Sequence, residues 1–293
     1  MIIGAIDLGT NTFDLLLAQV SEGKIKILYR EKQWVGLGTG MYPSMELKEE
    51  ALKRATRCLI HFVQIANEYH VNELRACGTS ALRDAINGSL WCDEIQEKTG
   101  LTVDVISGVQ EAKLVFAGIM NLTNLPSDGI IMDIGGGSTE LMSFRHKQLN
   151  QVFSLNIGVT RLLNEVDLNY RLSEDEIRRL EMLFSKESKQ LLPSINTLIG
   201  SAGAFETFFW LIQQESIPDG YCVSFDVLNL TELLDELIYT TYEQRLALDG
   251  VPDVRRKYLH VAALQVKWLI TTCGIKQVMA TTSGLCEGII TEV

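Results

Sequence analysis

Short apolar runs alternate along this chain with longer stretches in which apolar residues recur every three or four positions. An apolar run bounded by turn residues is typical of a strand, and the three-to-four spacing is typical of an amphipathic helix. The pattern predicts strands over 2–7, 13–20, 24–29 (after a turn at 22–23), 73–77, 102–106, 130–134, 141–144, 149–155, 195–200 and 276–280. It predicts helices over 45–69, from Ser80, over 90–98 and 109–121, from a capping box at 173–176, and over 254–273. Alternating strands and helices indicate an α/β protein.

The opening of the chain is repeated in its second half. Asp7 lies at the end of the first apolar run, before a Gly-Thr-Asn-Thr turn, and Asp133 lies at the end of a later run, before a Gly-Gly-Gly-Ser turn. This repeat indicates two domains of similar architecture. The polar, proline-containing segment 124–129 is the predicted boundary. We therefore expect domain I over 1–124, with about 281–293 packing back on it, and domain II over 125–280.

Turns of this kind offer a site for phosphate. Successive backbone amides in a turn rich in glycine, serine and threonine can converge on one spot and bind phosphate oxygens without a cationic side chain. The carboxylates beside the two turns, Asp7 and Asp133, suit Mg²⁺, which binds carboxylate, water and phosphate oxygens. The alternative is that each turn merely ends a strand. A matched pair of turns in a duplicated frame favours the functional interpretation.

The net charge limits how the chain could bind a polyanion. Its 293 residues include 26 Lys and Arg and 37 Asp and Glu, which gives a formal net charge of −11. We therefore expect no general binding to nucleic acid or to an anionic membrane, and a polyanion has to be held by a local patch, backbone amides or a metal. The six cysteines are scattered without a metal-binding spacing, and no apolar run is long enough to span a membrane. These features predict reduced cysteines and a cytoplasmic protein.

Four motifs carry a resemblance to a known family. They are D-L-G-T-N-T-F at 7–13, G-T-S-A-L-R-D-A at 78–85, I-S-G-V-Q-E-A at 106–112 and D-I-G-G-G-S-T-E at 133–140, followed by G-V-T-R-L at 158–162. In this order they resemble the exopolyphosphatase/guanosine pentaphosphate phosphohydrolase (Ppx/GppA) family of the actin, Hsp70 and sugar-kinase superfamily. The resemblance covers essentially the whole chain, whose length is that of the short family members. It implies an α/β fold of two ribonuclease-H-like (actin-like) domains with an active-site cleft between them.

The resemblance also implies roles for individual residues. Glu111 matches the family's general base, which orients and deprotonates the attacking water. Asp133 matches a metal-binding acid, and Asp7 and Glu140 are further candidate metal ligands, although Glu140 could instead hold its loop through hydrogen bonds. The residues expected to bind substrate phosphate are Gly9, Thr10, Asn11, Thr12, Arg83, Gly135, Gly136, Gly137 and Ser138. Without the resemblance, Glu111 would be interpreted as an acid in the first turn of a helix, and Arg83 as a solvated helix residue.

The chain departs from the family pattern in several places. Gln110 stands where the family often has Glu, and Gly36 and Cys286 stand where it commonly has Arg. The segment 200–205 is an atypical version of the loop that helps to form the nucleotide-side pocket. These departures concern the length of the substrate and nucleotide recognition more than the hydrolytic core.

The leading functional hypothesis is an Mg²⁺-dependent exopolyphosphatase, a hydrolase that releases orthophosphate from the terminal phosphoanhydride of inorganic polyphosphate. The alternatives are a guanosine pentaphosphate (pppGpp) 5′-phosphohydrolase, a small-molecule kinase of the same superfamily, and a non-catalytic sensor of polyphosphate or alarmone. The Ser-Gly-x-x-Glu-Ala element argues against the kinase, and the retained Glu111 argues against the sensor. A homodimer is compatible with the sequence.

Overall fold

The apolar runs form two separate mixed sheets, each in a unit of its own. A computed structural model describes residues 1–21, 24–167, 170–187 and 195–292. The chain divides into unit 1, Met1–Gly118 with Leu285–Val293, and unit 2, Ile119–Gly284. The extents of separately folding domains, expected at 1–124 and 125–280, stay a prediction. No helix in the described ranges is long and apolar enough to cross a membrane.

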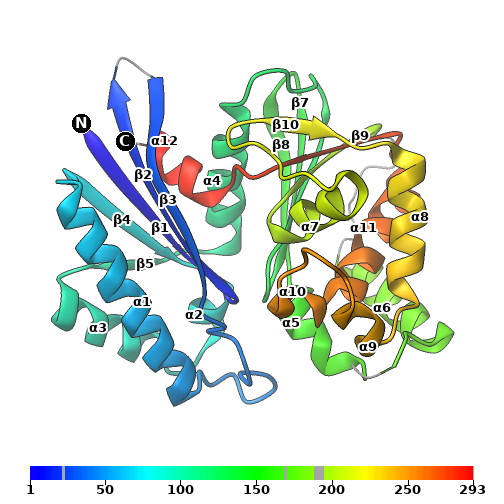
Figure 1. Ribbon diagram of the computed structural model, residues 1–293, viewed down its shortest axis with the longest axis horizontal. Helices are drawn as coiled ribbons and strands as arrows, with labels where there is room; N and C mark the ends of the chain where they lie inside the picture. Colours follow the sequence, from blue (N-terminus) through cyan, green and yellow to red (C-terminus); the bar gives the residue numbers. More distant parts are fainter. Residues whose placement is uncertain (22–23, 168–169, 188–194, 293) are drawn as a thin grey trace. The chain divides into compact units, whose positions relative to one another are not determined.

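The sheet of unit 1 has the order β3-β2-β1-β4-β5 (Figure 1). Its strands are β1 (Ile2–Leu8), β2 (Thr12–Ser21), β3 (Lys24–Trp34), β4 (Glu73–Gly78) and β5 (Val103–Val105). The first three strands form an antiparallel meander, and β4 and β5 run parallel to β1. This strand order agrees with the ribonuclease-H-like (actin-like) fold that the family resemblance implies. The expected turn at 22–23 lies outside the described residues.

Alternation along β1 and β2 separates two faces of this sheet. Ile6, Leu8, Phe13 and Leu15 enter a core that also takes residues from α1 (Glu49–Glu68), α2 (Ser80–Asp84) and α3 (Gly88–Thr99). The alternate residues belong to the other face, where α12 (Leu285–Thr291) contacts both strands and packs closely on α4 (Gly108–Met120). Asp7 falls on this second face because successive side chains of a strand point to opposite sides.

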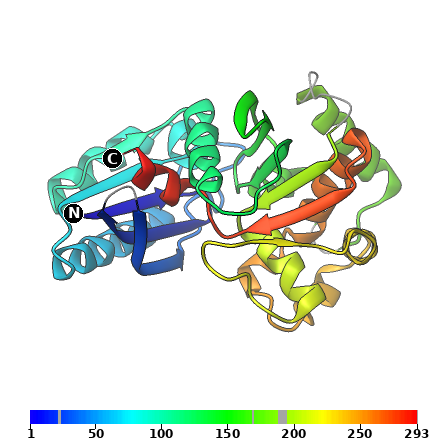
Figure 2. The same cartoon turned by 90° about the horizontal axis from the view of Figure 1, so that it is seen from above.

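The sheet of unit 2 repeats the same order with one strand added. It runs β10-β11-β9-β6-β7-β8, so β8-β7-β6-β9-β11 corresponds to β3-β2-β1-β4-β5. The strands are β6 (Gly129–Ile134), β7 (Thr139–Arg145), β8 (Gln148–Leu155), β9 (Thr197–Ser201), β10 (Cys222–Ser224) and β11 (Gln277–Thr281). Strands β6, β7 and β8 form an antiparallel meander, and β9 and β11 are parallel (Figure 2). The repeat seen in the sequence is therefore a repeat of topology.

Helices of unit 2 supply most of its apolar core. They are α5 (Val159–Leu162), α6 (Glu174–Glu187), α7 (Gly203–Gln213), α8 (Val227–Ile238), α9 (Tyr242–Leu246), α10 (Asp253–Arg256) and α11 (Leu259–Cys273). The core collects Ile130 and Met132 of β6 with residues of α5, α6, α7, α8 and α11, and α11 lies against α8. The predicted capping box is present, because the backbone N–H of Ser173 donates to Glu176 and that of Glu176 donates to the Ser173 hydroxyl.

Two helix predictions are corrected. The helix expected over 45–69 begins only at Glu49, because the side chain of Asn87 hydrogen-bonds both backbone groups of Leu47 and holds that residue outside the helix. The helix expected over 254–273 is two helices, α10 and α11. The carbonyl of Arg256, which a continuous helix would use internally, accepts instead from Arg245 Nε at 2.9 Å.

Candidate active site

The glycine turn between β6 and β7 is held from one side by the turn that follows β8. The N–H of Gly135 donates to the carbonyl of Ser138 at 3.0 Å and closes the loop 135–138, the unit 2 phosphate loop. The carbonyls of Gly135, Gly136 and Gly137 accept from backbone N–H groups of 158–161 at 2.8–3.3 Å. These donors are the first amides of α5, which would otherwise lack a partner inside their helix.

This bracing fixes the direction of the loop amides. In a planar trans peptide the N–H points away from the C=O of the preceding residue. Because the carbonyls of 135–137 face α5, the N–H groups of Gly136, Gly137 and Ser138 face the opposite way. Among the described residues these three amides have no acceptor. A row of amides of this kind suits a phosphate group.

The close packing of loop and turn requires glycine at position 158. A Cβ on Gly158 would overlap the backbone of Gly136, Gly137 and Ser138. The side chain of Arg161 adds a hydrogen bond from its Nε to the carbonyl of Gly137 at 2.9 Å. The G-V-T-R-L motif of the sequence thus provides the support of the unit 2 phosphate loop.

Two predicted metal ligands stand opposite each other at this loop. Asp133 of β6 pairs with Glu140 of β7 in the antiparallel register, which places both side chains on one face of the sheet. Glu140 is buried, and its Oε1 accepts from the hydroxyl of Ser154 at 2.8 Å. That bond fits a role in holding the loop, so both roles of Glu140 stay open.

Unit 1 braces its own turn in the same way. The N–H of Gly9 donates to the carbonyl of Thr12 at 3.0 Å, and the carbonyl of Asn11 accepts from the amides of Val35 and Gly36 at 3.0 and 2.8 Å. The segment 35–38 follows β3 as the segment 158–161 follows β8. Asp7 stands opposite Asp14 in the register, as Asp133 stands opposite Glu140. The two predicted phosphate loops therefore share a supporting design as well as a sequence pattern.

Arg83 and Glu111 are brought together in unit 1. Arg83 Nη1 lies 3.1 Å from Glu111 Oε2 and donates to the carbonyl of Ile106 at 2.9 Å. Glu111 is in the first turn of α4 and 8% exposed, so it is not a solvated helix-start acid. The neighbouring Gln110 forms a capping box with Ser107, with each side chain accepting from the other's backbone N–H at 3.0 and 3.3 Å. The departure at Gln110 is thus compatible with an intact start of α4.

An arginine from elsewhere in unit 1 lies beside Gly36. Gly36 has a left-handed backbone conformation with φ +61°, and a Cβ there would meet the hydroxyl of Thr39 at 2.8 Å. Arg54 of α1 donates to the carbonyls of Val35 and Gly36 at 2.7 and 3.2 Å. A guanidinium therefore lies beside this position, although its side chain comes from a different part of the sequence.

The second departure, at Cys286, also has an arginine nearby. Arg30 of β3 donates to Glu287 through Nη1 and to Asp14 through Nη2, both at 2.6 Å. Burial raises the pKa of Asp14 above its ordinary value, while Arg30 and Lys32 oppose that shift. Burial also raises the pKa of Cys286 well above 9, so this thiol stays protonated at neutral pH. We call Asp14, Arg30 and Glu287 the Arg30 cluster.

Within the segment 200–205, the side chain of Phe205 packs against Gly200. The ring of Phe205 lies directly against Gly200, so a Cβ there would overlap it. Ala202 is in a left-handed conformation with φ +68° before α7 begins. Ser201, the last residue of β9, donates its hydroxyl to the carbonyl of Ser283 at 3.1 Å. The ring of Phe205 belongs to the buried core of unit 2.

The oxygen ligands offered by Asp133 and Glu140 suit a hard, partly hydrated cation. Across the described ranges, no group of three or more His, Cys, Asp or Glu side chains could enclose a metal. A closed site of the kind that binds structural zinc is therefore absent from them. The opposed carboxylates Asp133 and Glu140 beside a row of amides fit Mg²⁺, which takes one or two carboxylates and fills its shell with water and phosphate oxygens.

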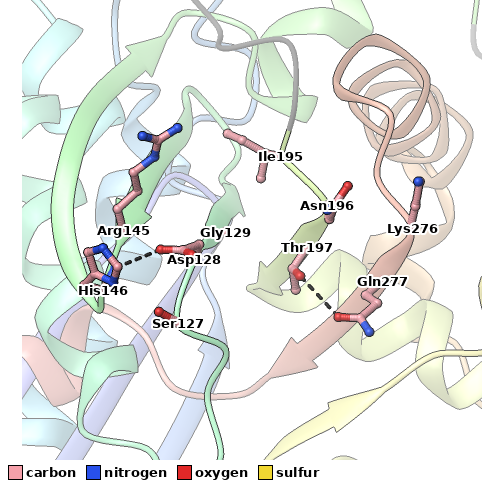
Figure 3. A pocket seen from close by; sticks show the side chains of 10 residues that line it. All are labelled: Ser127, Asp128, Gly129, Arg145, His146, Ile195, Asn196, Thr197, Lys276 and Gln277. Carbon is pink, nitrogen blue, oxygen red and sulfur yellow. Dashed lines mark hydrogen bonds between the residues drawn. The ribbon is translucent and has the colours of Figure 1, made fainter.

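A separate surface pocket of unit 2 contains none of the predicted site residues. Its volume is about 610 Å³, and Arg145 and Lys276 lie on opposite sides of it (Figure 3). On the Arg145 side, the carboxylate of Asp128 accepts from the backbone N–H of His146 at 2.8 Å. The pocket includes Gly129, which begins β6, whereas the unit 2 phosphate loop follows the other end of that strand.

Two residues outside the predicted site also shape the unit 2 phosphate loop. Gly158 belongs to the G-V-T-R-L motif, for which no residue role is predicted. Gln265 lies on the predominantly apolar helix α11, and its amide contacts both Thr139 and Ile157. The available signal was one amide side chain within the otherwise apolar segment 261–266.

Comparison with known proteins agrees with this arrangement. Residues 16–293 match the model of the Ppx/GppA phosphatase family. The chain is similar to an exopolyphosphatase from Cytophaga hutchinsonii, with 30% identity, a TM-score of 0.90, and coverage of 99% of this chain and 96% of the other. It resembles an exopolyphosphatase-like protein at 25% identity and a TM-score of 0.89, covering 99% and 97% of the two chains. A PPX-GPPA enzyme from Aquifex aeolicus shares the fold at 23% identity and a TM-score of 0.85, with coverage of 100% and 99%. The chain therefore belongs to the Ppx/GppA phosphatase family, as a hydrolase that acts on phosphoric anhydrides.

Proposed function

We propose that the chain is an exopolyphosphatase, which removes orthophosphate from the end of inorganic polyphosphate. The observation that carries this proposal is the row of amides of Gly136, Gly137 and Ser138, which face away from their bracing turn. Such a row binds a terminal phosphate by its oxygens alone and needs no nucleoside. The 30% identity to an exopolyphosphatase over almost the full length supports the same substrate class.

In this proposal Glu111 is the general base. Glu111 takes a proton from the water whose oxygen attacks the terminal phosphorus, and the bridging P–O bond breaks as the shortened chain leaves as an anion. The loop amides stabilise the charge on the equatorial oxygens of the transferred phosphoryl group. Mg²⁺, held by Asp133 with Asp7 and Glu140 as further candidate ligands, would neutralise negative charge on the phosphate oxygens.

Arg83 connects the base with the substrate. A guanidinium has five N–H donors, and Arg83 Nη1 makes the hydrogen bonds to Glu111 and Ile106. Its Nε also lies 3.9 Å from Asp84 Oδ1, as an ion pair. Among the described residues no further hydrogen bond uses the other N–H groups, so these can donate to a phosphate oxygen. We propose that Arg83 holds the carboxylate of Glu111 in place while it binds the terminal phosphate.

The segment 200–205 departs from the family's loop on the nucleotide side of the site. Because the resemblance assigns that loop to nucleotide recognition, the departure favours a substrate without a nucleoside. A linear phosphate chain does not require a pocket for a base or a ribose. We therefore propose polyphosphate as the preferred substrate and pppGpp as the alternative.

The test is orthophosphate release by the purified chain with Mg²⁺, on long-chain polyphosphate and on pppGpp in parallel. The Glu111→Gln variant is the background control, because it removes the proposed base and keeps the shape of the side chain. Release from polyphosphate that the variant lacks would support the proposal. Release from pppGpp alone would assign the alternative, and binding of polyphosphate without any release would indicate a sensor.

A further inference from the structure

Gln265 is a polar residue in the middle of an apolar helix. It is fully buried on α11, and its neighbours Leu264 and Val266 are buried as well. A buried amide is unfavourable unless its oxygen and its N–H groups find partners. A side chain of this type in a core therefore needs a structural reason.

Both ends of the Gln265 amide reach the support of the unit 2 phosphate loop. Its Oε1 accepts from the hydroxyl of Thr139 at 2.9 Å, and its Nε2 donates to the carbonyl of Ile157 at 2.9 Å. The carbonyl of Ile157 can only accept, which fixes the amide nitrogen on that side. Thr139 directly follows the loop 135–138, and Ile157 directly precedes the turn 158–161.

The strand pairing between these two segments ends just before Ile157. The ladder between β7 and β8 ends at the pair Thr139 and Leu155. Beyond that pair, the turn 158–161 holds the loop through its carbonyls, and the amide of Gln265 joins the two flanks. Backbone bonds therefore bring Thr139 and Ile157 near each other, and Gln265, more than 100 positions away in the sequence, adds a side chain that bonds both.

We propose that Gln265 is a positioning residue that sets the geometry of the unit 2 phosphate loop. By holding Thr139 and Ile157 together it keeps the turn 158–161 against the carbonyls of Gly135 and Gly136, which in turn aims the loop amides. Its consequence for catalysis rests on the proposed function, because those amides would bind the terminal phosphate.

The test compares Gln265→Met and Thr139→Val with the double variant and with Val266→Ala as a matched control. Met has a similar size and lacks both hydrogen bonds, and Val keeps the shape of Thr without the hydroxyl. Val266 is buried on the same helix and is not hydrogen-bonded to the loop through its side chain, so its truncation reports destabilisation alone. For each variant we would measure the melting temperature, kcat and KM for polyphosphate, and hydrogen exchange of the Val159 and Thr160 amides.

For Gln265→Met we expect kcat/KM to fall roughly 10- to 100-fold, with kcat lowered and KM raised, since small misplacements of binding groups cost about this much. The Val159 and Thr160 amides should exchange faster than in the control. The double variant should be no more than about twofold worse than Gln265→Met, because both changes remove the same contact. Equal losses of activity and protection in Val266→Ala at an equal loss of melting temperature would overturn the proposal.

A second readout separates this proposal from the proposed function. Exchange of the two amides, with and without inorganic phosphate as the probe, requires no turnover. If the wild-type chain releases no phosphate from polyphosphate, the proposed function is wrong, and faster exchange in Gln265→Met alone would still support the positioning role. If exchange is the same in Gln265→Met and Val266→Ala, the positioning role is wrong whatever the activity.

Discussion

At the scale of single residues, Glu111 forms a partly buried ion pair with Arg83. The two side chains are joined at 3.1 Å and are largely shielded from solvent. An acid placed only to stabilise the start of a helix would need neither the partner nor the burial. The ion pair is compatible with a base that is oriented before substrate arrives.

Replacing Glu111 by Gln tests this directly. Gln can still accept from Arg83 but cannot take a proton, so phosphate release should fall by roughly 10²–10⁴-fold, the usual contribution of a general base. Single-turnover phosphate release measures this, and Glu97→Gln on the exposed side of α3 is the matched control. Near-normal turnover would contradict the role. If Glu111→Gln and Arg83→Gln both lose activity and stability together, the ion pair has a structural role instead of a catalytic one.

Replacing Asp133 should change the Mg²⁺ dependence of activity more than the stability of the fold. Asp133→Asn is nearly isosteric and removes one negative charge from the proposed Mg²⁺ site, so the Mg²⁺ concentration for half-maximal activity should rise by about tenfold or more. Titration of activity with Mg²⁺ measures the shift. Asp128→Asn, just before the other end of the same strand, keeps an oxygen for the His146 amide and should leave the titration unchanged. An unshifted titration in Asp133→Asn would remove it from the metal site.

His260 should make the stability of the chain depend on pH. It is fully buried at the start of α11, and neither ring nitrogen has a hydrogen-bond partner among the described residues. Burial, and then the charge of Arg245, lower its pKa from 6.5 to about 3. Below pH 6.5 the unfolded chain therefore binds a proton that the folded chain does not. The free energy of unfolding should fall as the pH is lowered from 6.5 toward about 3.

The substitution His260→Leu isolates that contribution. Between about pH 7.5 and about pH 5 the variant should lose about 1–2 kcal/mol less stability than the wild type, because each pKa unit corresponds to about 1.4 kcal/mol. Urea unfolding at the two pH values measures the difference. Equal losses in both proteins would show that His260 does not titrate in this way.

At the scale of elements, a turn after the third strand of each meander supports the loop after the first. Segments 35–38 and 158–161 both donate backbone N–H groups to the carbonyls of a phosphate loop. Each support is itself held by a helix, through Arg54 of α1 in unit 1 and Gln265 of α11 in unit 2. In both units, therefore, a helix side chain holds a turn, and that turn holds a phosphate loop.

Gly158→Ala should disturb the contact between the turn 158–161 and the unit 2 phosphate loop. The new methyl group would overlap the loop backbone, so the turn and the loop must separate. We expect the free energy of unfolding to drop by about 1–3 kcal/mol, as for other overpacked sites, and kcat/KM to fall by roughly 100-fold. Denaturant unfolding and steady-state kinetics measure the two effects. Unchanged kinetics would mean that the loop does not depend on its support.

Local patterns predicted most elements, and distant contacts set the rest. Strands such as β1 and β6 could be predicted because alternation and turn residues are local signals. The break between α10 and α11 depends on the side chain of Arg245, and the late start of α1 depends on Asn87, which no local pattern reveals. No separate element is predicted from the sequence for helices α5, α7, α8, α9 and α12 or for strand β10.

The candidate site divides in the same way. The motifs located both loops, and they also included Arg83 and Glu111, which the fold joins. The functional contribution of Gly158 and Gln265 depends on a close approach between segments distant in the sequence, so the motif around Gly158 and the lone amide at Gln265 do not reveal it before the fold is known. The roles of all these residues stay predictions until the variants are measured.

At the scale of the whole molecule, the chain ends in the unit where it begins. Helix α12 follows β11 of unit 2 in sequence but packs on β1 and β2 of unit 1. The Arg30 cluster joins three distant positions there, and both acids are largely buried. Removing one partner from such a cluster leaves an uncompensated buried charge, which is strongly destabilising. Helix α12 is therefore buried against the sheet of unit 1, on the face opposite the main core.

The amide row of the unit 2 phosphate loop has a kinetic consequence. Backbone dipoles act over a few ångströms and carry no net charge, whereas the chain as a whole carries −11. A polyanion should therefore be repelled during its approach and attracted only on contact. Added monovalent salt screens the repulsion more than the contact, so association with polyphosphate should become faster as ionic strength rises, at fixed free Mg²⁺. Stopped-flow association rates measure this, and a rate that falls with salt would point to steering by cationic side chains instead.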